Sequence, residues 1–302
     1  LIKGKSGSTV ILSIARKGFT EELDFKIVRK PIKINSVSYG LLPDKKTGFV
    51  KIKIFNSETT NDFSKALKYF NKKKITKIIL DLRNNPGGTL LSAQGVSNLL
   101  LKKGKRIVTV KGRKGSKNKQ VIISTSNPLF SGKILILVNR GSASASEIVS
   151  AAIRDNYRGY LVGEKTFGKG SVQNSYTLDS KKKLGLKLTI ARYYTPKGIS
   201  IHKKGIHPDY KIQSNKVSAN DKKNIQKLYK SKILDSFIKP GIQYNIKTKN
   251  KLKKLLKASK INLPDRISYY LLKRKINSLK KKPLYDLEFD KQLKHAIRII
   301  NR

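Results

Sequence analysis

The 302-residue sequence contains no cysteine, methionine or tryptophan, and it has only three histidines. Without cysteine there is no disulfide framework, no thiol nucleophile and no thiolate metal site. None of His202, His207 and His295 lies in an H-E-x-x-H motif, so we expect neither a metal nor another cofactor. Because the chain lacks even an initiator methionine, we expect it to be part of a longer protein.

Acidic residues are also scarce: 18 Asp and Glu stand against 68 Lys and Arg, a formal net charge of +50. Such a basic chain suggests nucleic acid or an anionic membrane surface as a partner. However, Lys far outnumbers Arg and occurs with abundant Ile and Asn, as an AT-rich genome would also produce. The basic runs at 72–74 and 181–183 lack interleaved aromatic side chains for base stacking. A nucleic-acid-binding protein stays an alternative, but we expect no specific nucleic acid.

Long apolar runs are absent as well. No run reaches the roughly 18 to 20 residues that a membrane-spanning helix needs, and no signal peptide is recognisable. The sequence leaves open whether a membrane anchor precedes Leu1. The length allows one large domain with smaller additions.

The chemistry concentrates between Gly141 and Gln173. The apolar run 134–138 predicts a buried strand, and the apolar spacing after residue 145 predicts a helix. A serine at such a strand-to-helix turn lies beside unpaired backbone N–H groups, which can stabilise a developing oxyanion. Three serines occupy this turn: Ser142, Ser144 and Ser146.

Lys169 is a candidate base for this nucleophile. A helix over 145–156 rises about 18 Å, and the strand-like run 160–164 returns about 16 Å. The lysine therefore comes back towards Ser144. Gln173 follows Lys169 by an even spacing, which places both on one face of an extended segment, where the amide can orient the amine.

Plainer interpretations exist for both residues. Ser144 and Glu147 form an S-x-x-E capping box, which is common at the start of a helix. A lysine is by default a solvated surface charge. Lys169 differs because its immediate neighbours carry no charge and permit close packing. Desolvation there would favour the neutral amine that a base requires.

The same residues nearly match a phosphate-binding loop. The sequence GEKTFGKG (163–170) almost fits G-x-x-x-x-G-K-[ST]. Gly170 replaces the Ser or Thr that would bind magnesium, and the following residues predict a strand where this motif requires a helix. We therefore do not expect nucleotide binding.

A second strand-turn-helix junction precedes the first. The short apolar strand 78–82 leads into a turn at 84–88, and an apolar helical pattern starts at Leu90. Gly87 and Gly88 allow backbone N–H groups to approach a ligand closely. By itself, such a turn is more often merely tight than catalytic.

Together these motifs resemble the signatures of the carboxyl-terminal processing (tail-specific) peptidases, which are serine peptidases with a Ser-Lys dyad. The resemblance covers about residues 1–213. Its motifs are NRGSASASE (139–147), TFGKGSVQ (166–173), DLRNNPGG (81–88), LTIARYYTPKG (188–198) and GIHPD (205–209).

The resemblance implies a role for each candidate residue. Ser144 would be the nucleophile, Lys169 the general base and Gln173 the residue that positions the lysine. The oxyanion hole would consist of the N–H of Ala145 and that of Gly87 or Gly88. Attack on a peptide carbonyl would form an acyl-enzyme, and no cofactor would be needed.

Strands alternating with helices predict an α/β fold. Further strands are predicted at 49–55, 107–111, 120–124 and 184–194, with a helix capped by Thr59 or Thr60. The resemblance narrows this fold to a crotonase-like/Clp-protease-like αβ core, assigned to residues 33–213.

The two ends of the chain differ from the core. Residues 1–32 contain two strand-like runs around Gly18 and resemble the C-terminal part of a PDZ domain, the alternative being a plain hairpin. Residues 214–302 form a lysine-rich helical extension. Its last part, 286–300, resembles a helix that in many relatives follows the G-I-x-P-D motif closely. A cap, an oligomer surface and a charged arm all stay open for the extension.

We therefore expect a serine endopeptidase that cleaves proteins near accessible, apolar C-terminal tails. The alternatives are an inactive peptidase-fold scaffold and the basic nucleic-acid-binding protein. The resemblance implies an extracytoplasmic location, periplasmic or at the inner membrane of a bacterium. Oligomerisation stays open.

Overall fold

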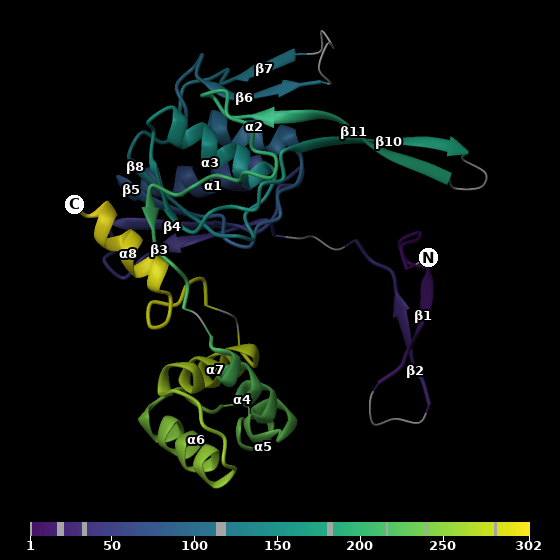
Figure 1. Cartoon of the computed structure of the whole chain (residues 1–302), viewed down its shortest axis with the longest axis vertical. Coiled ribbons are helices and arrows are strands. Elements are labelled where there is room, and N and C mark those ends of the chain that lie inside the picture. Colours follow the sequence, from purple (N-terminus) through teal and green to yellow (C-terminus); the bar gives the residue numbers. More distant parts are fainter. Residues whose placement is uncertain are drawn as a thin grey trace. The chain divides into compact units, whose positions relative to one another are not determined.

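The structure is a computed structural model of the chain (Figure 1). It describes residues 2–16, 21–31, 35–112, 119–179, 184–215, 217–239, 241–280 and 283–302. The chain divides into two compact units, Leu1–Asn35 and Ser36–Arg302.

The first unit is a two-stranded antiparallel sheet. Strands β1 (Thr9–Ile14) and β2 (Leu23–Val28) pair with Thr9 opposite Val28. The two predicted strands are thus confirmed, while the turn at Gly18 lies outside the described residues. A two-stranded sheet alone is only marginally stable in water.

The second unit is built on a six-stranded sheet with the order β12-β9-β8-β5-β4-β3. Neighbouring strands are parallel except β3 and β4, which are antiparallel. The central strands β5 and β8 are continuous apolar runs because helices cover both of their faces. The six strands are β3 (Val37–Leu41), β4 (Thr47–Ile52), β5 (Lys77–Asp81), β8 (Lys133–Val138), β9 (Tyr160–Gly163) and β12 (Tyr210–Lys211).

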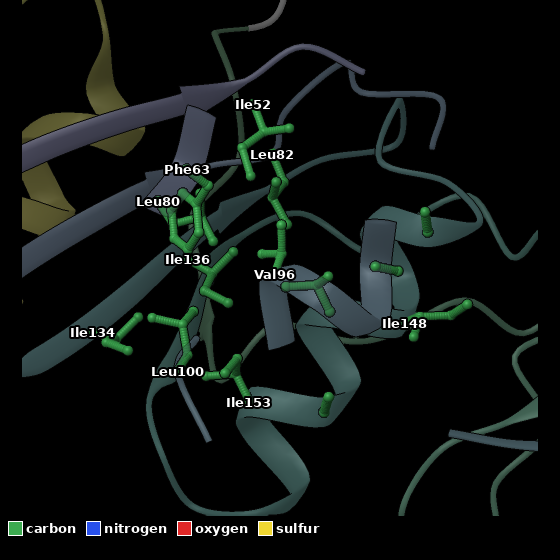
Figure 2. Close-up of a cluster of buried hydrophobic side chains, with 14 of the residues drawn as sticks. Ile52, Phe63, Leu80, Leu82, Val96, Leu100, Ile134, Ile136, Ile148 and Ile153 are labelled. Atoms are coloured by element: carbon green, nitrogen blue, oxygen red, sulfur yellow. The ribbon is translucent and has the colours of Figure 1, made fainter. Parts of the chain in front are cut away.

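Three helices cover one face of this sheet: α1 (Thr59–Lys72), α2 (Leu90–Asn98) and α3 (Ala145–Asp155). Phe63, Leu67 and Phe70 recur at helical spacing in α1 and are fully buried. They share a core with strand residues such as Leu80 and Ile136 (Figure 2). This core fixes the start of α2 and α3 relative to the ends of β5 and β8.

The opposite face is covered by α8 (Lys291–Ile300). Leu293, Ala296 and Ile300 pack in one buried cluster with Leu137 of β8 and Val162 of β9. Helix α8, the last helix of the segment 214–302, therefore packs on the six-stranded sheet and belongs to its core.

A second sheet is antiparallel, with the order β10-β11-β6-β7. Its strands are β6 (Arg106–Lys111), β7 (Lys119–Ile123), β10 (Ser171–Asp179) and β11 (Leu184–Tyr194). The hairpin of β10 and β11 extends beyond the other two strands (Figure 1). A register shift interrupts it between Val172 and Gln173. Most of the predicted basic loop 111–120 lies outside the described residues.

Four helices form what we call the helical lobe, residues 219–278. They are α4 (Ala219–Lys230), α5 (Ile233–Phe237), α6 (Ile246–Ala258) and α7 (Asp265–Ser278). The lobe has its own buried cluster, which includes Leu228, Leu252 and Leu272. Within the described parts of the chain, no helix is both long and apolar enough to cross a bilayer.

The predicted strands and helices are confirmed, with three local differences. Only Lys291–Ile300 of the expected terminal helix 286–300 are helical. The run 49–55 ends as strand β4 at Ile52, and Phe55 makes only an isolated bridge with Gly88. The cap of α1 is Glu58, while the Thr59 hydroxyl accepts a hydrogen bond from the Asn56 N–H. The Thr59 hydroxyl, which was expected to cap the helix, therefore binds the backbone of the preceding loop instead.

The packing of α8 predicts a stability effect. Replacing the fully buried Leu293 by alanine should lower the free energy of unfolding by about 2 to 5 kcal/mol, because a cavity replaces the side chain. Leu91→Ala is the matched control: this leucine is 77% exposed, and its loss should change stability by no more than about 0.5 kcal/mol. Denaturant unfolding measures both. Equal values for the two variants would contradict the assigned role of α8.

Candidate active site

Ser144 lies at the sharp turn between β8 and α3. Its backbone has φ 55° and ψ −115°, a conformation that is uncommon for any residue except glycine. Strain of this kind persists only where the surrounding structure enforces it, and it is frequent at functional sites. The Ser144 side chain is half-buried.

The turn that contains Gly87 packs directly against Ser144. A Cβ atom on Gly87, which has φ 98°, would lie 2.6 Å from the Ala143 carbonyl oxygen and 2.8 Å from the Ala145 nitrogen. Only glycine therefore fits here. The Ala143 N–H also donates to the Asn85 carbonyl at 3.0 Å, so the two strand-turn-helix junctions are in direct contact.

The neighbouring serines hold these junctions together. The Ser142 hydroxyl donates to the Leu82 carbonyl at 2.8 Å, and the Ser146 hydroxyl donates to the Asn85 carbonyl at 3.0 Å. Both serines are fully buried. They have a structural role, which leaves Ser144 as the accessible serine of the three.

A pair of asparagines makes a further link. The Asn84 N–H donates to the Asn139 side-chain oxygen at 2.9 Å, and the Asn139 amide donates back to the Asn84 side chain at 3.0 Å. Asn84 has φ 57°, a left-handed conformation that asparagine tolerates better than most residues. The reciprocal bonds fix the start of the loop 84–88 against the start of the Ser144 turn.

Glu147 joins the Ser144 turn to the loop of Lys169. Its carboxylate is fully buried and accepts hydrogen bonds from four donors. They are the N–H groups of Ser144 (2.9 Å), Gly168 (2.7 Å) and Lys169 (2.8 Å) and the hydroxyl of Thr166 (2.5 Å). The Ser144 and Lys169 N–H groups share one oxygen, Oε2.

Sequence reasoning recognised Glu147 only as half of a capping box. The structure confirms that the carboxylate accepts the Ser144 N–H, but the same group also anchors residues 166–169. The sequence shows no acidic residue next to Lys169. In the structure, however, the buried Glu147 carboxylate accepts a hydrogen bond from the Lys169 N–H. The S-x-x-E spacing was the only signal, and it carries no information about the second loop.

The backbone N–H groups beside Ser144 differ in whether they have a hydrogen-bond acceptor. The Gly87 N–H donates to the Asn85 side-chain oxygen at 2.9 Å and is therefore engaged. In the part of the chain that the structure describes, the N–H groups of Gly88 and Ala145 have no acceptor. A Cβ atom on Gly88, at φ 149°, would lie only 1.8 Å from the Phe55 carbonyl oxygen, so this position also requires glycine.

Lys169 and Gln173 are both exposed. Among the described residues, no hydrogen bond joins the side chains of Ser144, Lys169 and Gln173. The Gln173 amide lies 3.5 Å from the Thr189 hydroxyl of the neighbouring strand β11. The structure therefore brings the backbones of Ser144 and Lys169 to one carboxylate. The side chains of Lys169 and Gln173 are exposed to solvent.

The segment 201–206 supports the loop of Lys169. The Lys203 N–H donates to the Gly168 carbonyl at 2.8 Å, and a Cβ on Gly170 would lie 2.3 Å from the His202 nitrogen. The Ile206 N–H donates to the Thr166 hydroxyl at 2.7 Å. Since residues 171–179 form strand β10, the helix that a phosphate-binding loop would need at this point is replaced by a strand.

Three largely buried ionisable groups, Asp81, Arg83 and Tyr193, have shifted pKa values. Burial by itself would raise the pKa of Asp81, but the adjacent Arg83 guanidinium and its hydrogen bonds hold that pKa below its usual value. Burial would lower the pKa of Arg83, yet pairing with Asp81 and Asp290 raises it overall. Burial also raises the pKa of Tyr193. No group of three His, Cys, Asp or Glu side chains suited to a metal ion occurs within the described ranges.

Comparison with curated proteins identifies relatives of similar sequence. The carboxy-terminal-processing protease of Bartonella bacilliformis is 38% identical over 216 residues, which cover 70% of this chain and 49% of that protein. The carboxy-terminal processing protease CtpA of Bacillus subtilis is 38% identical over 213 residues, covering 70% and 44%. The chain thus spans about half the length of these relatives.

Solved structures show the same fold. The photosystem II D1 C-terminal processing protease matches with a TM-score of 0.54 and 30% identity, covering 70% of this chain and 57% of that one. A putative S41 protease from Bacteroides fragilis matches in fold, with a TM-score of 0.51 and 17% identity over 76% and 66% of the two chains. The model of Peptidase family S41 matches residues 46–212. This match covers more than half of the chain and includes the strained Ser144 at its strand-to-helix turn. The chain therefore belongs to peptidase family S41.

Proposed function

We propose that this chain carries the catalytic part of a serine endopeptidase that processes the C-terminal regions of proteins. One observation supports this most strongly. The strained Ser144 lies beside the N–H groups of Gly88 and Ala145, for which the described part of the chain offers no acceptor, and Glu147 links Ser144 to the loop of Lys169. The names of the relatives from Bartonella and Bacillus agree with this activity.

The proposed reaction begins with attack of the Ser144 hydroxyl oxygen on a peptide carbonyl carbon. A neutral Lys169 amine takes the hydroxyl proton and passes it to the departing amine of the substrate. The acyl-enzyme that forms is then hydrolysed by water, with Lys169 again acting as the base.

Gly88 is the better of the two glycine candidates for the oxyanion hole. The Gly87 N–H already donates to the Asn85 side chain, so it is not free to bind an oxyanion. We therefore assign the two donors to Gly88 and Ala145. Each donor of this kind is worth roughly 3 kcal/mol of barrier in related reactions.

Lys169 and Gln173 require the substrate to complete their arrangement. Both side chains are exposed, and a protonated lysine cannot act as a base. A bound polypeptide would cover Lys169 and exclude water, which favours the neutral amine. In this proposal Gln173 then leaves its long contact with Thr189 and accepts a hydrogen bond from the lysine amine.

Exposed apolar side chains beside the site support an apolar substrate tail. Leu91, in the first turn of α2, is 77% exposed, and Phe167, two residues before Lys169, is 67% exposed. Large apolar side chains at such exposure are typical of surfaces that bind a partner. The other parts of the proposal rest on the family resemblance: a PDZ remnant at 1–32, a peptidase core at 33–213, an extension at 214–302 and a periplasmic or inner-membrane location.

Substitution of the dyad tests the proposed function. Ser144→Ala and Lys169→Ala should each abolish cleavage of an unstructured protein with an apolar C-terminal tail, because one removes the nucleophile and the other the base. Lys165→Ala is the matched control, since Lys165 is an exposed lysine of the same loop. It should keep activity within about twofold of the parent.

Gel-based cleavage assays with the unsubstituted protein (the parent) and its variants, with and without a metal chelator, provide the measurement. Chelator-insensitive cleavage that depends on both residues supports the serine mechanism. If the parent cleaves nothing, the inactive-scaffold alternative takes precedence. If Lys169→Ala behaves like Lys165→Ala, Lys169 is not the base.

Glu147→Gln tests the link between the two loops. A glutamine offers one acceptor oxygen and adds an N–H₂ group that faces buried donors. We expect the free energy of unfolding to fall by about 1 to 3 kcal/mol and kcat to fall on the order of tenfold or more, because the nucleophile and base lose their common anchor.

Glu58→Gln serves as the control for this variant, because Glu58 is exposed and makes no side-chain capping bond. It should leave kcat and the unfolding free energy unchanged within error. Retention of full kcat by a folded Glu147→Gln variant would show that the shared carboxylate does not position the two loops.

A further inference from the structure

The Arg83 guanidinium is held between two carboxylates that come from distant parts of the chain. Asp81 ends strand β5 and accepts from Arg83 Nε and Nη2 at 2.9 Å each. Asp290 precedes α8 and accepts from Nη1 at 2.8 Å and from Nη2 at 2.6 Å. Both contacts are bidentate, which gives directional as well as electrostatic specificity. We call these three residues the Arg83 clamp.

The hydrogen bonds of the clamp hold the guanidinium in one orientation. Gln292 supplies a further acceptor for Nη1 at 3.2 Å, so each of the five guanidinium N–H bonds has its own acceptor. The side chains of Asp81, Arg83 and Asp290 are 1%, 12% and 20% exposed. Ion pairs shielded from solvent in this way are screened much less than surface pairs.

Arg83 is the residue directly before the loop 84–88. Asn84 is locked to Asn139, and the Asn85 side chain accepts the Gly87 N–H. The loop ends at Gly88, whose N–H has no acceptor among the residues that the structure describes. The clamp therefore fixes one end of the loop, and the contact of Gly88 with Phe55 fixes the other.

We propose that Asp290, acting through Arg83, is a positioning residue for the oxyanion-binding loop 84–88. This inference rests on the proposed peptidase function. It gives Asp290, which follows the helical lobe in the chain, a role in the geometry of the site, although no hydrogen bond or ion pair of the described residues joins Asp290 to Ser144 or Lys169.

The chemical reason lies in the geometry that an oxyanion hole requires. A donor stabilises the transition state when it lies about 2.7 to 3.1 Å from the oxyanion, a position that the ground-state carbonyl oxygen does not occupy. A small displacement of the Gly88 N–H therefore weakens binding of the transition state more than binding of the substrate.

The segment 286–290 is also tied to the helical lobe. Lys273 of α7 donates to Asp286 at 2.8 Å and to Glu288 at 3.0 Å, and the Tyr244 hydroxyl donates to Glu288 at 2.7 Å. Glu288 thus lies in the same segment as Asp290 but does not contact Arg83, so it provides a matched control.

Asp290→Asn separates positioning from helix capping. Asp290 accepts the Leu293 N–H at 2.9 Å and so caps α8. Asparagine is an equally good N-cap, but its amide has one oxygen and no charge, so it cannot hold Arg83 through two acceptors. The experiment compares Asp290→Asn, Asp290→Glu and Glu288→Gln in the full chain, with Ser144→Ala as the inactive reference.

The readouts are kcat, KM, and the inhibition constants of one peptide prepared as a boronate and as an amide. The boronate forms a tetrahedral adduct with the serine and needs the oxyanion hole, whereas the amide does not. For Asp290→Asn we expect about a tenfold lower kcat and a boronate constant about tenfold higher. KM and the amide constant should stay within about twofold, and Glu288→Gln should leave all four values within about twofold.

Asp290→Glu provides the second test. It keeps the charge and both oxygens but displaces them by one methylene, so its boronate constant should lie between those of the parent and Asp290→Asn. Thermal unfolding verifies that each variant is folded. If Asp290→Asn does not fold, Asp290→Glu decides: a boronate constant equal to that of the parent overturns the inference.

Other outcomes separate a failure of the positioning role from a failure of the proposed function. An active parent whose boronate constant responds equally to Asp290→Asn and Glu288→Gln overturns the positioning role alone. A parent that is as inactive as Ser144→Ala overturns the proposed function, and the inference falls with it.

Discussion

The arrangement of the site depends on one buried charge, the Glu147 carboxylate. A carboxylate out of contact with water is tolerated only when hydrogen-bond donors replace its hydration. Here the four donors come from two segments: the Ser144 turn, and residues 166–169 before β10. Neither segment can move away without leaving the charge unsatisfied. The hydrogen bonds that stabilise the carboxylate therefore also fix the position of the strained serine relative to the lysine loop.

Much of the fold could be predicted because it is encoded in local periodicity. The run 134–138, the helix after residue 145 and the strand-turn-helix around 84–88 follow from apolar spacing and turn residues. The candidate residues Ser144 and Lys169 were predicted from their motifs. Their backbone N–H groups both donate to the Glu147 carboxylate, which agrees with the estimated return of the chain.

Other features could not be predicted, because they depend on partners remote in sequence. Whether Gly87 or Gly88 has a free N–H is decided by the Asn85 side chain. The second role of Glu147 depends on residues 166–169, which the capping-box pattern does not include. The place of α8 on the sheet was also invisible, since an amphipathic helix indicates that it packs but not against which surface.

The attachment of the helical lobe has a consequence for how the protein varies. The chain leaves the sheet after Ile212 and returns at Gln292, and these two residues are hydrogen-bonded at 2.8 Å, from the Gln292 amide to the Ile212 carbonyl. An insertion whose two ends meet adds little strain to its host, and the entropic cost of closing such an excursion grows only slowly with its length. A change in the size or surface charge of the lobe should therefore cost the sheet little, whereas a change in the short span from Asp290 to Gln292 would remove hydrogen bonds to Arg83.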